Sequence, residues 1–119
     1  MILSKTEIIA DTKKRQEILE ILFSLKLQTQ GEPGCLSCCI TQELENEKLI
    51  TYETLWQTEQ SLYNHIRSSQ YRNLLAAIDL SSEAPDVRFY TVSRNEGMEL
   101  VKKVLGYAER ERLSRKPEA

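Results

Sequence analysis

The feature that most constrains this chain is a repeated change in the spacing of its apolar residues. In residues 1–10, MILSKTEIIA, apolar and β-branched side chains fall on both sides of an extended segment, which is typical of a β-strand. From Asp11, a possible N-cap, the spacing becomes three and four, with Ile18, Leu22 and Leu25 on one side, and this predicts an amphipathic helix. The stretch QGEPG then ends that helix, because proline cannot extend the hydrogen-bond ladder and glycine accepts a reversed backbone.

The rest of the chain repeats this alternation. GCLSCCITQEL and LITYETLW read as two strands, and the polar turn ENEK between them predicts a hairpin. After Trp56 the helical spacing returns and continues to about Leu80, with a predicted break near Ser68. VRFYTV then reads as a fourth strand, and Ser93 with Glu96 matches a capping box that opens a last helix.

The resulting order is β-α-β-β-α-β followed by a C-terminal helix. It predicts a ferredoxin-like α+β domain in residues 1–94, with both long helices on one face of the sheet, and a helical extension in residues 95–119. A sheet covered on one side leaves its other side bare, so we expect the protein to stack this side on a second copy as a homodimer. The extension has an apolar stripe that we expect to pack across the dimer: Met98, Val101, Leu105 and Ala108.

Size and charge narrow the classes of function. With 119 residues, 40% apolar and 29% charged, the chain fits one folded domain. A net charge of −2 provides no basic field, so nucleic acid is not an expected partner. No apolar stretch approaches the ~20 residues that cross a bilayer, and the N-terminus does not read as a secretory signal. We therefore expect a cytoplasmic protein with no membrane partner.

Three cysteines lie within GCLSCCI, between Gly34 and Ile40. Strand alternation predicts that Cys35 and Cys39 lie on one side and Cys38 on the other, so Cys35 and Cys38 would not bind one ion. A structural zinc site needs about four converging ligands, and the chain offers a single histidine in addition. We predict small, partly buried side chains here, with no metal site.

Trp56 is the only tryptophan and His65 the only histidine. Nine positions separate them across a strand-to-helix junction, which could bring both rings to the mouth of one cavity. The alternative is that both rings only pack in the core, because most single tryptophans are buried and most single histidines have structural or surface roles.

Several strings of the chain together resemble the antibiotic biosynthesis monooxygenase family: EPGCL, TYETLW, QTEQSLYNHIRSSQYRNLLAAIDL and APDVRFYTV. The resemblance extends over roughly Lys5–Ser93. Its more specific parts are EPG at residues 32–34 and the W-x8-H-x2-S run of Trp56, His65 and Ser68. It implies a dimeric α/β barrel of two ferredoxin-like protomers, each with a small-molecule pocket between sheet and helices.

The family includes cofactor-independent oxygenases of quinols and anthrones, haem-degrading enzymes and proteins of no established activity. The haem-degrading branch has an asparagine in the first strand and a tryptophan and a histidine on the second helix. Here MILSKTEIIA has no asparagine, and the two helical positions hold His65 and Leu75. In the polyketide-oxidising branch an asparagine and a tyrosine flank the strand tryptophan, and here Tyr52 and Leu62 take their places. The resemblance therefore disfavours haem degradation and does not identify the substrate.

The function we expect is oxidation of a small aromatic or quinol-type compound by O2 without a dissociable cofactor. His65 is the candidate for proton transfer, because its ordinary pKa lies near neutrality. Trp56 could stack on a planar substrate and offer its indole N–H. Four more side chains are predicted to contact the substrate: Tyr52, Tyr90, Arg67 and Arg72. Two alternatives stay open, namely a module that binds a small molecule without turnover and a barrel that serves only in assembly.

Overall fold

The computed structural model describes residues 1–106 and confirms the predicted order of elements. In chain order these are β1 (Ile2–Ile9), α1 (Arg15–Thr29), β2 (Cys35–Gln42), β3 (Leu49–Trp56), α2 (Glu59–Ile66), α3 (Ser69–Asp79), β4 (Asp86–Thr91) and α4 (Met98–Leu105). The predicted break near Ser68 is present, because Ser68 is the N-cap of α3 and its hydroxyl accepts from the Tyr71 N–H. The helix after β3 is therefore two helices.

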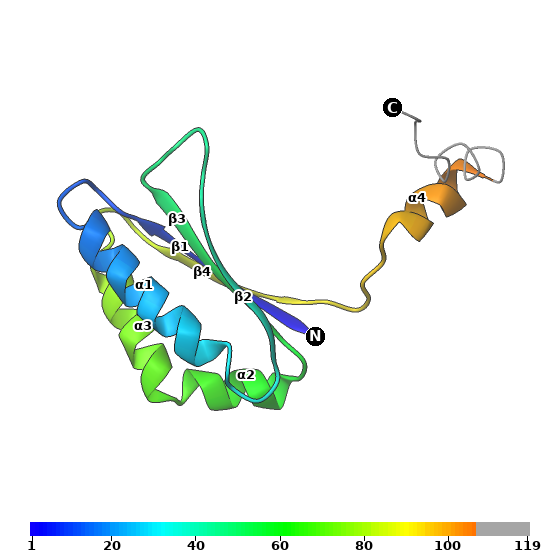
Figure 1. Ribbon diagram of the computed structural model, residues 1–119, viewed down its shortest axis with the longest axis horizontal. Helices are drawn as coiled ribbons and strands as arrows, with labels where there is room; N and C mark the ends of the chain where they lie inside the picture. Colours follow the sequence, from blue (N-terminus) through cyan, green and yellow to red (C-terminus); the bar gives the residue numbers. More distant parts are fainter. Residues whose placement is uncertain (107–119) are drawn as a thin grey trace.

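The four strands form one antiparallel sheet in the order β2-β3-β1-β4, which is the ferredoxin-like arrangement (Figure 1). Residues of β1 and β3 alternate between buried and half-buried along their whole length, since successive side chains point to opposite faces. The buried set faces α1 and α3, which lie side by side along one face of the sheet (Figure 1). The main core fills this space, with Ile8, Ile18, Leu22, Ile50 and Leu74 among its members.

Two predicted helix starts need correction. Asp11 does accept hydrogen bonds from the N–H groups of Lys13 and Lys14, but it caps a turn, and α1 begins only at Arg15. The predicted capping box of Ser93 and Glu96 is wrong. The helix begins five residues after Ser93, at Met98, and its N-cap Gly97 has no side chain to cap it. The side chain of Glu96 instead lies 3.7 Å from Arg94.

Within residues 1–106 no helix covers the other face of the sheet, and α4 stands away from the rest of the fold on that bare side (Figure 1). The radius of gyration is 18.2 Å, against roughly 13 Å for a compact domain of this size. The projection of α4 from the domain contributes to this difference (Figure 1). Ala108, which was predicted to belong to the apolar stripe, lies outside the described residues.

Candidate functional site

The two rings singled out in the sequence lie against each other. Trp56 is the last residue of β3, and Thr58 caps α2 two positions later through a capping box with Ser61. The chain therefore turns back sharply, and the second turn of α2 places His65 on the indole. The ring centroids are 4.5 Å apart with an interplanar angle of 28°, which is a stacked arrangement. Tyr71 and the same imidazole form a T-shaped pair, with 5.5 Å between centroids and an interplanar angle of 89°.

Glu32 completes this cluster. Its Oε2 lies 2.7 Å from His65 Nδ1. Because a carboxylate accepts hydrogen bonds, Nδ1 carries the proton and donates it, and Nε2 is left as the basic nitrogen. Thirty-three positions separate the two residues, and sequence reasoning noted the EPG string without finding this pairing. The only signal was that Glu32 and the single histidine both lie in motifs of the same family.

Gly34 explains why the EPG turn can reach α2. Its φ is +85°, and a Cβ on it would lie 2.4 Å from the Cβ of Ser61, so only glycine fits without displacement. The Gly34 carbonyl also accepts from the Gln57 N–H at 2.8 Å. The turn is therefore fixed between β3 and α2, and this fixes the Glu32 carboxylate beside His65.

The environment of His65 favours its neutral form. The residue is 3% exposed, and burial lowers the pKa of its imidazole below the ordinary value of 6.5, although the charge and hydrogen bond of Glu32 act in the opposite direction. Trp56 is fully buried, and its indole N–H donates to Thr54 Oγ1 at 2.8 Å. The imidazole thus has a basic nitrogen in the core, and the indole N–H already has an acceptor.

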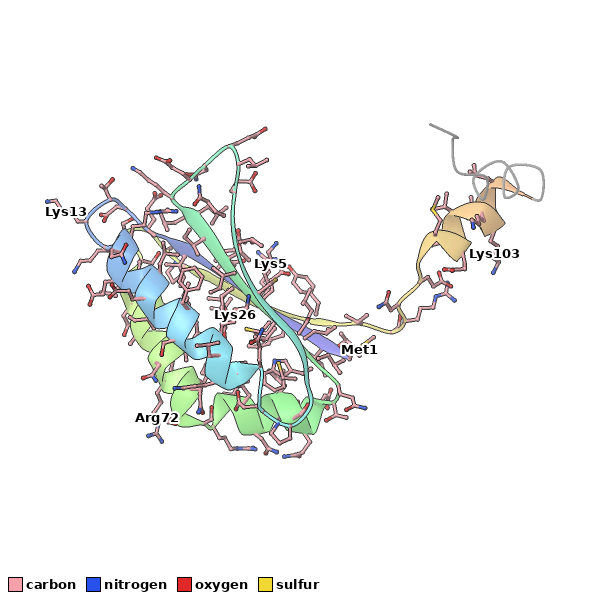
Figure 2. All side chains as sticks on the ribbon, in the orientation of Figure 1. Met1, Lys5, Lys13, Lys26, Arg72 and Lys103 are labelled. Atoms are coloured by element: carbon pink, nitrogen blue, oxygen red, sulfur yellow. The ribbon has the colours of Figure 1, made fainter. Side chains whose placement is uncertain are left out.

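The structure does not bring the other four predicted residues to this cluster. Tyr52 is buried four residues before Trp56 on β3. Its hydroxyl donates to Thr29 Oγ1 at 3.2 Å, and the Cys38 thiol lies 3.3 Å from the same hydroxyl. Tyr90 pairs with Leu3 in the register of β4 with β1, and it is therefore on the bare face. Arg67 and Arg72 are exposed, and Arg72 projects outward from the helix layer (Figure 2).

The cysteines depart from the predicted alternation. A β-bulge between Cys35 and Ser37 shifts the register, so that Cys35 opposes Trp56 and Cys38 opposes Thr54. Cys35 therefore shares the helix-facing side with Cys38, and the prediction that they lie on opposite sides was wrong. Burial raises the pKa of both thiols. Within residues 1–106 no three His, Cys, Asp or Glu side chains gather closely enough to hold a metal ion.

A hollow of about 350 Å³ lies beside the ring cluster, between α2 and the β1–β4 edge of the sheet. Its lining residues are Ile2, Glu59, Leu62, Tyr63, Ile66, Phe89 and Thr91. Ile2 and Leu62 also pack against Trp56, so the hollow and the ring cluster share one wall. The volume suits a small organic molecule, and the wall is mainly apolar with a few polar groups. Sequence reasoning missed Phe89 and Tyr63, because nothing in one sequence shows which apolar side chains border a space.

Comparison with known proteins agrees with this fold. The profile of the family described as antibiotic biosynthesis monooxygenase matches residues 1–77. A solved structure of a conserved protein from Methanosarcina mazei Go1 is 28% identical, with a TM-score of 0.69 over 75% of this chain and 89% of that one. A provisionally named antibiotic biosynthesis monooxygenase from Deinococcus radiodurans is 15% identical, with a TM-score of 0.74 over 82% of this chain and 97% of that one.

No relative is found among curated proteins. None of the helices in residues 1–106 is both long and apolar enough to cross a membrane.

Proposed function

The chain belongs to the antibiotic biosynthesis monooxygenase family, and on this premise we propose that it oxidises a small, electron-rich aromatic or quinol-type compound with O2. No dissociable cofactor takes part in the proposed reaction. The substrate loses a proton, the resulting anion transfers electrons to O2, and one oxygen atom enters the product. For an anthrone-type substrate a ring CH2 becomes C=O, and the second oxygen atom leaves as water.

The observation that carries this proposal is the 2.7 Å contact between Glu32 and His65. Glu32 holds the Nδ1–H, so that the neutral ring presents Nε2 as a proton acceptor. Burial keeps the pKa of His65 below its ordinary value, and the ring is therefore largely unprotonated at neutral pH. Once protonated, the imidazolium lies next to the Glu32 carboxylate, which stabilises the charge that proton transfer creates.

The hollow between α2 and the sheet edge is the proposed substrate pocket. Ile2 and Leu62 separate it from the indole of Trp56. A planar substrate in the hollow would lie on these two side chains, with the ring cluster directly behind them. Phe89 and Tyr63 supply aromatic surface, while Glu59 and Thr91 supply polar contacts on the same wall.

A second candidate function is binding of a small molecule without turnover. One observation favours it, namely that both rings are almost fully buried and the indole N–H is already bonded to Thr54. In this case the Glu32–His65 pair would only hold the turn against α2, and the hollow would be the whole of the site.

Oxygen uptake separates the two functions. Purified protein is mixed with a panel of hydroquinones and anthrones, and O2 consumption is recorded for wild type, His65→Gln and Glu32→Gln. The oxygenase proposal expects both variants to lose at least tenfold in rate. The matched control is Glu83→Gln, which makes the same change as Glu32→Gln at an exposed acid outside the ring cluster. If no compound is oxidised, or if His65→Gln is as fast as wild type, His65 is not the proton acceptor.

Fluorescence tests binding independently, because Trp56 is the only tryptophan. A ligand in the hollow should change the emission of Trp56 through the shared wall, and Phe89→Ala should weaken this effect. A fluorescence response without oxygen uptake would support the binding function.

A further inference from the structure

Two parts of the molecule project from opposite ends of the sheet. The turn of residues 43–48 joins β2 to β3 at the end where Ile9 pairs with Leu49. At the other end Thr91 pairs with Ile2, and the chain continues from there to α4. Both projections extend to the bare side of the sheet (Figure 1).

α4 has an apolar surface that its own domain leaves open. Met98, Val101 and Leu105 are each about half exposed, although they lie at the three- and four-residue spacing of one helix side. An isolated helix of eight residues is not stable in water, so α4 needs a surface to pack against. Lys102 and Lys103 add two positive charges, and Figure 2 shows Lys103 on this helix, remote from the sheet.

The β2–β3 turn has the complementary chemistry. Leu44 at its tip is 99% exposed, so a large apolar side chain lies entirely in solvent. Glu43, Glu45 and Glu47 surround it, and all three are exposed. Leu44 with its neighbouring glutamates is therefore complementary, in both apolar surface and charge, to the apolar side of α4 with its two lysines.

Distance separates the first turn of α4 from the β2–β3 turn of the same chain. The hydrogen bond from the Val92 N–H to the Met1 carbonyl holds the start of the linker at the α2 end of the sheet. The turn begins beyond Ile9, roughly 30 Å away at ~3.3 Å per residue. Residues 92–97 span at most about 20 Å, so the first turn of α4 does not reach its own β2–β3 turn.

The bare face between the two projections suits a second copy. Lys5 and Arg88 oppose each other on it, with Glu7, Glu53 and Asp86 as neighbours in the register. A face with both signs of charge is self-complementary under a two-fold axis that reverses the strand direction. That axis brings the end of the sheet from which α4 projects next to the β2–β3-turn end of the other copy, and the linker of residues 92–97 spans the width of the sheet between them.

We propose that α4 of one copy packs on the β2–β3 turn of a second copy when the two bare faces stack. Met98, Val101 and Leu105 cover Leu44 of the second copy, and Lys102 and Lys103 lie near its acids. Two-fold symmetry makes two such contacts in each dimer. The inference presupposes the stacked dimer but does not depend on the oxygenase activity.

Charge reversal tests this contact. Sedimentation equilibrium measures the dimer Kd for wild type, for Lys102→Glu with Lys103→Glu, for Glu43→Lys with Glu45→Lys, and for the fourfold combination. We expect each double variant to raise the Kd at least tenfold, and the combination to return it to within about threefold of wild type. Unchanged Kd values, or no recovery in the combination, would overturn the contact, and a monomeric wild type would overturn the dimer as well.

Cross-linking gives a readout that does not depend on variants. A zero-length reagent joins lysine to carboxylate in a mixture of unlabelled and 15N-labelled wild-type protein. We expect mixed-isotope peptides that join Lys102 or Lys103 to residues 43–47. Cross-links found only within one isotope form would overturn the proposal. Oxygen uptake in the same samples shows separately whether the proposed activity stands.

Discussion

The helix-facing side of the sheet contains two clusters with different construction. The larger one, under α1 and α3, is aliphatic, with Ile18 and Leu22 fully buried in it. The smaller one, under α2, contains Ile2, Trp56 and Leu62 and is stacked on His65. Apolar area holds the first cluster, whereas the second also contains two directional hydrogen bonds, from His65 Nδ1 to Glu32 and from the Trp56 indole to Thr54. The first cluster is therefore the main source of stability in this account, and the second is the part for which we propose a role in chemistry.

The largest expected effect is in the aliphatic cluster. Leu22→Ala removes a fully buried side chain and should destabilise the protein by about 2–5 kcal/mol. Urea unfolding followed by circular dichroism measures the change. Leu27→Ala, at a position that is 77% exposed on the same helix, is the matched control and should change stability by less than about 0.5 kcal/mol. A small effect at Leu22 would mean that this cluster is not the main source of stability.

Gly34→Ala should be next in size. The φ of +85° and the approach of Ser61 both oppose a Cβ at this position, at a cost of about 1–3 kcal/mol. Because the turn also holds Glu32, the variant should loosen the contact to His65, and the imidazole resonances in NMR should shift. Gly31→Ala is the control, since its Cβ would meet its nearest atom at 3.6 Å. Equal stability of the two variants would show that the turn is not fixed as described.

The smaller cluster should also make stability depend on pH. The pKa of His65 is lower in the folded chain than its ordinary value of 6.5, so the unfolded chain binds the extra proton first. The contribution of His65 to the free energy of unfolding should therefore be fully present above about pH 6.5. It should be lost as the pH falls from there toward the folded pKa. Glu32→Gln removes a group that raises this pKa, and it should strengthen the dependence.

Urea midpoints between about pH 8 and 5.5 give the measurement for this prediction. His65→Gln should remove the slope in the upper part of this range, where carboxylates do not titrate. A stability that rises on acidification in this range would reverse the sign and contradict the assigned state of His65.

The smallest expected effect is at Arg72, which lies outside both clusters. Arg72→Ala should change stability by no more than about 0.5 kcal/mol. If the arginine contacts the substrate, as the sequence predicts, KM for that substrate rises in the variant while stability is unchanged. A KM equal to that of wild type would show that Arg72 does not contact the substrate.

Most of the fold could be predicted from local spacing. The two-residue alternation in β1 and β3 and the helical spacing of Ile18, Leu22 and Leu25 are properties of short segments, and the structure follows them. The bulge at Cys35 could not be predicted in this way, because it changes the register without changing the composition of the strand. The start of α4 was missed because Ser93 and Glu96 fit a local motif that the backbone does not adopt.

The site was predictable only in part. Trp56 and His65 were identified because each is the only residue of its type and both fall in family motifs. The pairing of Glu32 with His65 depends on a turn that Gly34 allows to approach α2, and such a contact across 33 positions has no periodic signature. The hollow is likewise a property of how α2 crosses the sheet edge, which no single segment encodes.

The most direct test of the account is the protonation state of the histidine ring. Because His65 is the only histidine, a long-range 1H–15N NMR spectrum reports on it without ambiguity. At about pH 7.5, well above its ordinary pKa, the account predicts a neutral ring with the proton on Nδ1 and a bare Nε2. A neutral ring with the proton on Nε2, or a doubly protonated imidazolium, would contradict the assignment of His65 as a proton acceptor held by Glu32.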